Sequence, residues 1–351
     1  MYTRRLSLLA LPLRVHSLQY NIIRRYYSAE CQPHREPFHK SLDLIDFFAK
    51  VNEKTKPSYV FAHGAAGFAK KGRPVLEDRG DYRSVQVGED AYFQRVDGLG
   101  VADGVGGWSG ARAANVALCS RKLMHYCYLQ MERFDNVDDP CFYEYEKADP
   151  VKILQESYSE ALYEEQTEGI VGSTTACIAI LRHDELRIAN LGDCGISVIR
   201  NNSYLFRSEE QQHSFNFPYQ LGTGSPDKPT DAQVFNVKVE RGDIIILGSD
   251  GLYDNLFDRD ILALVRTHIA AYIMPGSAHR PPRLLNFDPQ HLAAALADRA
   301  KCVSEDRRNV DSPFQTRAIH EGFYYQGGKT DDITVLVAVV RDSEDSPDRR
   351  L

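Results

Sequence analysis

The chain of 351 residues is 43% hydrophobic and 26% charged, a mixture typical of a globular protein that can bury a large core, as one large domain or two small ones. Its formal net charge of −7 argues against nucleic acid as the main partner, because a nucleic-acid-binding surface has to be basic. Seven scattered cysteines favour a reducing compartment over a disulfide framework, and no apolar run reaches the ~20 residues that a membrane span requires.

The N-terminal segment, residues 1–27, contains five arginines but no lysine and no acid, so the rest of the chain carries a charge of −12. Its apolar residues recur at helical spacing: Leu8, Leu11, Val15, Leu18 and Ile22. This composition is typical of a mitochondrial presequence, and the sequence from Arg25 to Ser28 resembles a cleavage site of the matrix peptidase. We therefore expect cleavage near Ser28 and a location in the mitochondrial matrix. A secretory signal with residues 6–13 as its apolar core, and a disordered basic tail, are the alternatives.

The rest of the chain is predicted to form a leader, one domain and a short tail. Residues 28–57 are polar and interrupted by prolines, and we interpret them as a leader or linker. The domain extends over 58–342. The charged segment 343–351 is expected to be a disordered tail.

Hydrophobic periodicity predicts the elements of this domain in chain order. Strands are expected at 59–62, 88–93, 98–102, 174–181, 185–190, 196–200, 233–240, 243–247 and 333–340. Helices are expected at 112–133, 151–162, 259–273 and 289–303, and loops at 63–73, 135–149, 208–231 and 304–329. Helix pairs that separate groups of strands joined by short turns predict an α/β sandwich of antiparallel sheets.

Acidic residues recur at the ends of apolar strands. Asp103, Asp250 and Asp331 each occupy such a position, and Glu89 and Asp90 add a further acidic point. Gathering these carboxylates without a cation costs several kcal/mol of desolvation and repulsion. Ligand sets made only of oxygen select hard ions such as Mg²⁺ or Mn²⁺, and zinc is disfavoured because no histidines or cysteines have ligand spacing. Two such ions can polarise a phosphoryl group and generate hydroxide near neutral pH.

Several single motifs have other interpretations. An isolated Asp-Gly pair is more often a turn, so repetition at several strand ends carries the metal hypothesis. The segment Gly327 to Thr330 precedes a strand, whereas a phosphate-binding P-loop precedes a helix. No Gly-x-Ser-x-Gly elbow is present. We interpret Asp193 as a structural strand-end residue and Trp108 as a packing anchor over the glycine turn.

Six motifs occur in a characteristic order. They are Gly88-Glu89-Asp90, Ala102-Asp103-Gly104, Gly172-Ser173-Thr174-Thr175, Asn190-Leu191-Gly192-Asp193, Gly248-Ser249-Asp250-Gly251 and Thr330-Asp331-Asp332-Ile333-Thr334-Val335. As an ordered set, over about residues 60–342, the sequence resembles the metal-dependent protein phosphatases of the PP2C (PPM) family. The Asp-Gly-Val-Gly-Gly-Trp variant from Asp103 to Trp108 is similar to that of the mitochondrial PTC7-type branch.

The resemblance implies an α+β fold, an α-β-β-α sandwich of two antiparallel sheets flanked by helix pairs, with two Mn²⁺ or Mg²⁺ ions at one end. It implies that Asp103 bridges both ions and that Gly104 supplies a backbone carbonyl. Asp250 and Asp331 would hold one ion, while Glu89 and Asp90 would serve the other, directly or through water. A metal-bridging water would attack phosphoserine or phosphothreonine in line, without a covalent enzyme intermediate.

The sequence departs from the family pattern at two positions. Val105 stands where many relatives have a histidine that protonates the leaving oxygen, so a water molecule or another side chain would act instead, with His63 and His213 as candidates. Val85 stands where many relatives have an arginine that binds phosphate. The candidates to replace that arginine are Lys70, Lys71, Arg79 and Arg83.

The function predicted from these features is a protein serine/threonine phosphatase that acts as a monomer on phosphorylated proteins. A catalytically weak phosphoprotein-binding regulator is the alternative that the two valines suggest, although keeping expensive buried carboxylates argues against it. A two-metal nuclease or small-phosphoester hydrolase would use similar ligands. The loops at 208–231 and 304–329 are candidates for substrate recognition, or are solvated connections.

Overall fold

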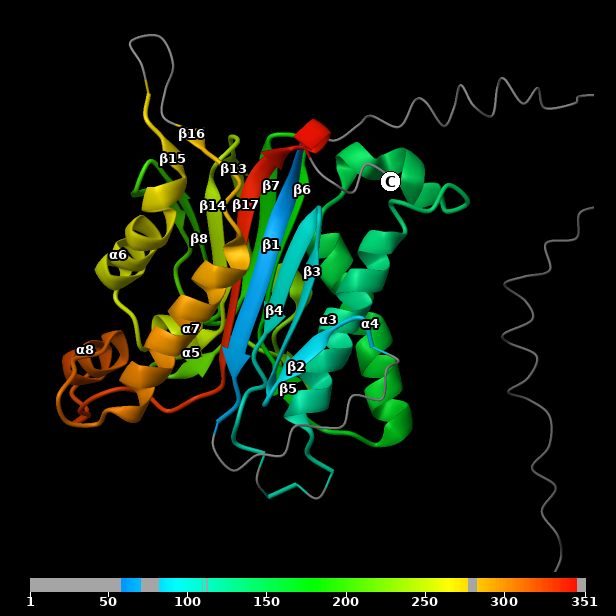
Figure 1. The fold of residues 1–351 in the computed structure, drawn as a ribbon. Coiled ribbons are helices and arrows are strands. Elements are labelled where there is room, and N and C mark those ends of the chain that lie inside the picture. The colour runs from blue at the N-terminus through cyan, green and yellow to red at the C-terminus, as the bar shows by residue number, and fades with distance from the viewer. Residues whose placement is uncertain (1–57, 71–81, 109, 112, 277–282, 346–351) are drawn as a thin grey trace, which may run out of the picture. The chain divides into compact units, whose positions relative to one another are not determined.

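Two antiparallel sheets lie face to face in the computed structural model, which describes residues 58–70, 82–108, 110–111, 113–276 and 283–345 (Figure 1). The five-stranded sheet has the order β1 (Tyr59–Phe68), β17 (Ile333–Asp342), β14 (Ile244–Gly248), β8 (Gly195–Arg200), β9 (Ser203–Arg207). The six-stranded sheet has the order β13 (Gln233–Lys238), β7 (Glu185–Leu191), β6 (Ala176–Arg182), β4 (Gly98–Ala102), β3 (Asp90–Arg95), β2 (Val85–Val87).

The alternation of side chains along each strand builds three separate layers of core. In β17, Val335 and Val337 pack toward the helices, while Leu336 and Ala338 pack against the other sheet. This two-residue period follows from the pleat, which points successive side chains to opposite faces. Because both faces of the strand are covered, its sequence is an unbroken apolar run and not an alternating one.

One helix pair covers the outer face of each sheet. Helices α3 (Val116–Glu132) and α4 (Pro150–Glu168) pack on the six-stranded sheet, and α6 (Asp258–Ile269) and α7 (Pro289–Glu305) pack on the five-stranded sheet (Figure 1). Asn115, Asp149 and Asp288 cap α3, α4 and α7 by accepting hydrogen bonds from backbone N–H groups of the first turn. The predicted sandwich of antiparallel sheets flanked by helix pairs is therefore confirmed.

Short elements connect these layers. They are β5 (Ser173–Thr174), β10 (Gln212–Ser214), β11 (Phe217–Pro218), β12 (Leu221–Gly222), β15 (Ile273–Met274), β16 (Arg283–Leu284), α5 (Asp250–Tyr253), α8 (Pro313–His320), and the 3₁₀ turns η1 (Pro140–Lys147), η2 (Pro229–Asp231), η3 (Ala270–Tyr272) and η4 (Ser343–Asp345). The six cysteines within the described ranges are all free thiols. No helix in that part of the chain combines the length and the apolar character needed to cross a bilayer.

The structure differs from the predicted elements in several places. Strand β1 continues to Phe68, through residues that were expected to form a loop. Its glycines let helix α7 pack closely against the strand, since a Cβ on Gly64 would lie 2.4 Å from the Cα of Gln290. The Gln290 side chain bonds both backbone groups of Ala65, at 3.1 and 2.9 Å. The expected loop at 304–329 contains α8, and the expected loop at 135–149 contains η1. The predicted presequence and leader, 1–57, lie outside the described residues.

Candidate metal centre

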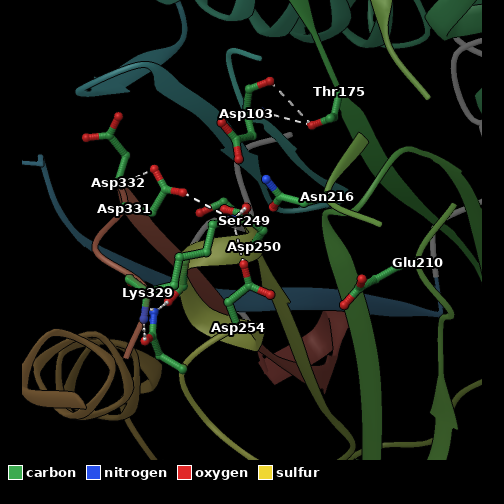
Figure 2. A network of polar contacts seen from close by, with 12 residues as sticks. Asp103, Thr175, Glu210, Asn216, Ser249, Asp250, Asp254, Lys329, Asp331 and Asp332 are labelled. Carbon is green, nitrogen blue, oxygen red and sulfur yellow. Dashed lines mark hydrogen bonds and ion pairs between the residues drawn. The ribbon is translucent and has the colours of Figure 1, made fainter. Parts of the chain in front are cut away.

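The register of the sheets brings five aspartates to one end of the sandwich. Ala91 of β3 pairs with Ala102 of β4, so Asp90 and Asp103 occupy the same sheet edge. Gly248 of β14 pairs with Gly195 of β8 and with Val335 of β17. The residues just beyond these pairs, at the same end of the other sheet, are Asp250, Asp193 and Asp331. Figure 2 shows Asp103, Asp250 and Asp331 in this cluster.

Backbone hydrogen bonds fix Asp103 at the end of β4. Its N–H donates to Thr175 Oγ1 at 3.0 Å, and its carbonyl accepts from Thr174 Oγ1 at 2.8 Å and from the Thr175 N–H at 2.9 Å. The Gly104 N–H donates to the carbonyl of Glu89 at 3.2 Å, which ties the two acidic motifs together. These hydrogen bonds from the threonine motif engage only the backbone of Asp103, so they position its carboxylate without using the carboxylate oxygens.

Asp332 joins three segments that are far apart in the sequence. Its buried carboxylate accepts from the Glu89 N–H at 2.9 Å and from the Lys70 N–H. The Lys70 side chain then reaches the neighbouring Asp331, with Nζ 3.2 Å from Oδ1. Asp332 therefore holds the end of β1 and the β2–β3 turn against the start of β17.

Burial and mutual repulsion make Asp103, Asp90 and Asp193 reluctant to ionise in the absence of a counter-charge. Burial raises the pKa of Asp103 well above its usual value, and the charges of Asp250 and Asp90 raise it further. Burial also raises the pKa of Asp90, with Asp332 adding to the effect. For Asp193, burial and the nearby Asp250 act in the same direction. A cation bound among these carboxyl groups would favour their ionised forms and so offset the effect of burial and repulsion on their pKa values.

A lysine that the sequence analysis missed lies within the cluster. The ammonium of Lys329 is 2.6 Å from Asp254 Oδ2 and 3.3 Å from Asp331 Oδ2, and it also contacts Asp250 Oδ2 (Figure 2). Burial alone would lower the pKa of Lys329, but Asp250 and the two other carboxylates outweigh it and raise the pKa well above its usual value. The sequence feature that could have indicated this lysine is its position two residues before the strand-end aspartate Asp331. Its partner Asp254, one helical turn after Asp250, becomes visible only in three dimensions.

The charged network continues away from the cluster to α8. Asp254 also contacts Arg317 of α8, whose Nη1 lies 2.9 Å from Glu210 Oε1. Burial raises the pKa of Glu210 to about 7, although Arg317 opposes the shift. The arrangement anchors α8 next to the acidic cluster through alternating charges.

The remaining predicted residues fall in different places. Arg83 lies 5.8 Å over the Tyr128 ring of α3, and no ion pair links it to the acidic cluster among the described residues. His63 lies inside β1, opposite Ala338, five residue pairs away from the strand end at Phe68. His213 is paired with Asp227 at 3.0 Å and stacks on Tyr219. Lys71 and Arg79 lie outside the described residues.

Four further positions were singled out in the sequence. Val85 is 47% exposed on β2, and Val105 follows the Asp103 turn. Trp108 does more than pack, since its Nε1–H donates to Ser173 Oγ at 2.9 Å. Asp193, interpreted as structural, lies near Asp250, and its carboxylate belongs to the same cluster.

The donor set suits a hard divalent cation. Asp250 Oδ1 and Asp193 Oδ1 are buried, and neither accepts a hydrogen bond from any described residue. Buried carboxylate oxygens without partners are expensive unless an ion compensates them. Within the described ranges, no group of three or more such side chains could hold an ion as it stands. The Lys329 ammonium lies among these carboxylates, in contact with Asp250 and Asp331.

Comparisons with known proteins agree with this geometry. The family model "Stage II sporulation protein E (SpoIIE)" matches residues 98–285. The chain is 37% identical over 259 residues to "Probable protein phosphatase 2C 80" of Arabidopsis thaliana, covering 73% of this chain and 55% of that protein. It is 33% identical to "Protein phosphatase PTC7 homolog" of Xenopus laevis, covering 85% of this chain and 95% of that protein.

The fold is likewise similar to a solved structure. The X-ray structure of the photosystem II phosphatase PBCP matches with a TM-score of 0.60 and 30% identity, covering 80% of this chain and 99% of that one. The chain spans about half the length of the plant relatives that it matches.

Proposed function

Because the chain belongs to the PP2C family of metal-dependent protein phosphatases, we propose that it hydrolyses phosphoserine and phosphothreonine in proteins. The observation that carries this proposal is the meeting of Asp103, Asp250 and Asp331, from three separate strand ends, in one buried acidic cluster. A regulator that only bound phosphoproteins would have no use for these carboxylates, whose burial and mutual repulsion reduce the stability of the fold.

The proposed cofactors are two Mn²⁺ or Mg²⁺ ions. The residues that would hold them are Asp103, the carbonyl of Gly104, Asp250, Asp331, Glu89 and Asp90. When bound, such ions supply Lewis-acid activation of a water molecule and of the phosphoryl group. Thr174 and Thr175 keep the Asp103 carboxylate at the strand end, and Asp332 keeps the Glu89 backbone beside it.

Because valine occupies position 85, we propose that another basic side chain binds the phosphate. Lys70 is the proposed contact because its ammonium stands 3.2 Å from Asp331, at the edge of the acidic cluster. Lys71 and Arg79, which follow it in the sequence, are further candidates. With the apolar Val105 in the family's histidine position, we propose that water delivers the proton to the leaving oxygen.

The experiment is phosphate release from a phosphothreonine peptide by the full chain, with Mn²⁺, with Mg²⁺ and with EDTA. Asp103→Asn is the matched variant, since it keeps the side-chain shape and removes the charge. We expect turnover with either metal ion, none in EDTA and none in the variant. A folded chain without turnover under any metal would favour the phosphoprotein-binding alternative. Equal activity on nucleotides or sugar phosphates would favour a small-phosphoester hydrolase.

The proposed location is the mitochondrial matrix, on the basis of the arginine-rich, acid-free residues 1–27. A C-terminally tagged chain should enter mitochondria and begin near Ser28 when sequenced. Replacement of Arg4, Arg5 and Arg14 by glutamine should abolish import, whereas secretion of the tagged chain would contradict the proposal. We also propose a monomer, which light scattering of the purified chain tests.

A further inference from the structure

A cavity lined by several charged side chains lies beside the acidic cluster. Its volume is about 290 Å³, and Asp331 forms part of its wall. The other side chains that matter come from three segments: Phe68 and Lys70 at the end of β1, Lys301 and Arg307 at the end of α7, and Thr330 before β17. The cavity therefore adjoins the carboxylate cluster and shares Asp331 with it.

Three cationic side chains line this cavity, and contacts hold each of them in place. The Lys301 ammonium lies 4.1 Å over the Phe68 ring, a cation–π distance. Arg307 Nη2 donates to Thr330 Oγ1 at 3.2 Å, and Lys70 contacts Asp331. The charges are thus positioned before any ligand arrives, which reduces the entropy lost on binding.

The glycine pair before Lys329 explains why Arg307 and Thr330 meet. A Cβ on Gly328 would lie 2.0 Å from the carbonyl oxygen of Val303, so only glycine lets this segment press against the end of α7. Thr330 Oγ1 can then donate to the Ser304 carbonyl at 3.1 Å. The same backbone path delivers Lys329 to the acidic cluster and Thr330 to the cavity.

The charge balance of the cavity favours an anion. Lys70, Lys301 and Arg307 face two carboxylates, those of Glu305 and Asp331. The Asp331 charge is shared between Lys70 and Lys329, so the cavity keeps a positive excess in a chain whose net charge is −7. Its volume corresponds to about ten water molecules at ~30 Å³ each, which is enough for a phosphoryl or carboxylate group.

We propose that this cavity binds an anionic side chain of the substrate that flanks the phosphorylated residue. The group would be a second phosphoryl group or a carboxylate, since both present oxygens that Lys301 and Arg307 can bind. The inference rests on the proposed phosphatase function, because Lys70 and Asp331 border both the cavity and the acidic cluster. It makes the cavity the source of a preference for acidic or multiply phosphorylated sites.

The test compares three phosphothreonine peptides that differ in their flanking residues. One has alanines, one has glutamates, and one has a non-hydrolysable phosphonate analogue of phosphoserine. The variant is Lys301→Glu, and the matched control is Arg299→Glu, an exposed residue of the same helix outside the cavity. Binding of fluorescent versions of the peptides in EDTA, read by anisotropy, gives a measurement that does not depend on turnover.

We expect the wild-type chain and Arg299→Glu to favour the acidic peptides about five- to tenfold in kcat/KM and in affinity, as befits a few partly exposed ion pairs. Lys301→Glu should lose this preference, and 0.5 M salt should weaken it in the wild type. Preference for both acidic peptides identifies a general anion site, and preference for the phosphonate alone identifies a phosphoryl site.

Two results would overturn the inference: equal rates on all three peptides, or the same preference in Lys301→Glu as in Arg299→Glu. Failure of the proposed function looks different, because then no peptide is hydrolysed. The anisotropy measurement still decides on the cavity in that case, since acidic peptides must bind more tightly than the alanine peptide. Circular dichroism of Lys301→Glu shows whether the variant is folded.

Discussion

Replacement of Lys329 by methionine tests whether this side chain serves as the cluster's own counter-ion. The ammonium contacts Asp250, Asp254 and Asp331, and only 15% of the side chain is exposed. Methionine keeps most of the length and removes the charge. In the metal-free chain Asp250 would then lose its cationic contact, whereas Asp254 would keep Arg317 and Asp331 would keep Lys70.

The expected loss follows from burial. The Asp254 side chain is 3% exposed and that of Asp250 is 9% exposed, so both are poorly solvated. Removing one partner of a buried ion pair typically costs 3–5 kcal/mol, because the other charge is left uncompensated. Asp254 keeps its contact with Arg317, which places our expectation at the lower end, about 3 kcal/mol of unfolding free energy in EDTA. The matched control is Lys152→Met, since Lys152 is 67% exposed and its pair with Glu156 spans 4.0 Å.

The assay is urea unfolding in EDTA and in saturating Mn²⁺, with calorimetric titration of Mn²⁺ as a second readout. Lys329→Met should recover much of its loss when Mn²⁺ is present, because the ion takes over the neutralisation. It should also bind Mn²⁺ more tightly than the wild type, since no ammonium has to be displaced. If Lys329→Met is no less stable in EDTA than Lys152→Met, the counter-ion argument is wrong.

Three further predictions concern other residues. Asp103→Asn should end turnover yet raise the unfolding free energy in EDTA, because it removes a carboxyl group whose pKa is raised by burial and by the neighbouring aspartates; a urea melt that shows lower stability would contradict this. Burial, partly opposed by Arg317, raises the pKa of Glu210 from 4.5 to about 7. Between these two pH values the folded chain holds a proton that the unfolded chain has lost. The unfolding free energy in EDTA should therefore fall as the pH rises from 4.5 to 7. Glu210→Gln should reduce the slope of that profile and gain about 2 kcal/mol at pH 8, while the buried aspartates keep part of the slope; an unchanged slope in the variant would rule the effect out. Gly328→Ala should lose about 1–3 kcal/mol in the same urea assay, since its Cβ would collide with the Val303 carbonyl, and an unchanged midpoint would refute the close approach.

Much of the sandwich could be predicted because its strands and helices have strong local patterns. The apolar run at 333–340 became β17, and the periodic stripe at 289–303 became α7, each within two residues at either end. The short helix α8 was missed because eight residues carry too little periodicity, although its capping Ser312 and following Pro313 were a readable signal. Strand β1 was cut short because its glycines imitate a loop when the helix that fills their space is unknown.

The candidate site was predictable in part for the same reason. Acids at strand ends can be recognised in a sequence, and antiparallel pairing then brings Asp90 next to Asp103. Lys329 could not be assigned, since its role depends on Asp254, 75 residues away in the chain. The cavity could not be predicted from the sequence either, because Lys301 lines it only when the end of α7 lies beside β1.

The pairing of β1 with β17 determines when the domain can be completed during its synthesis. The first described strand pairs with the last one over ten residues, from Tyr59 opposite Asp342 to Phe68 opposite Ile333. The ribosome therefore releases almost the whole domain before the edge strand finds its neighbour, and such distant pairing is slow. Asp331 emerges with the same final strand. A nascent chain thus carries its other carboxylates without the complete cluster until Asp331 and β17 have emerged from the ribosome.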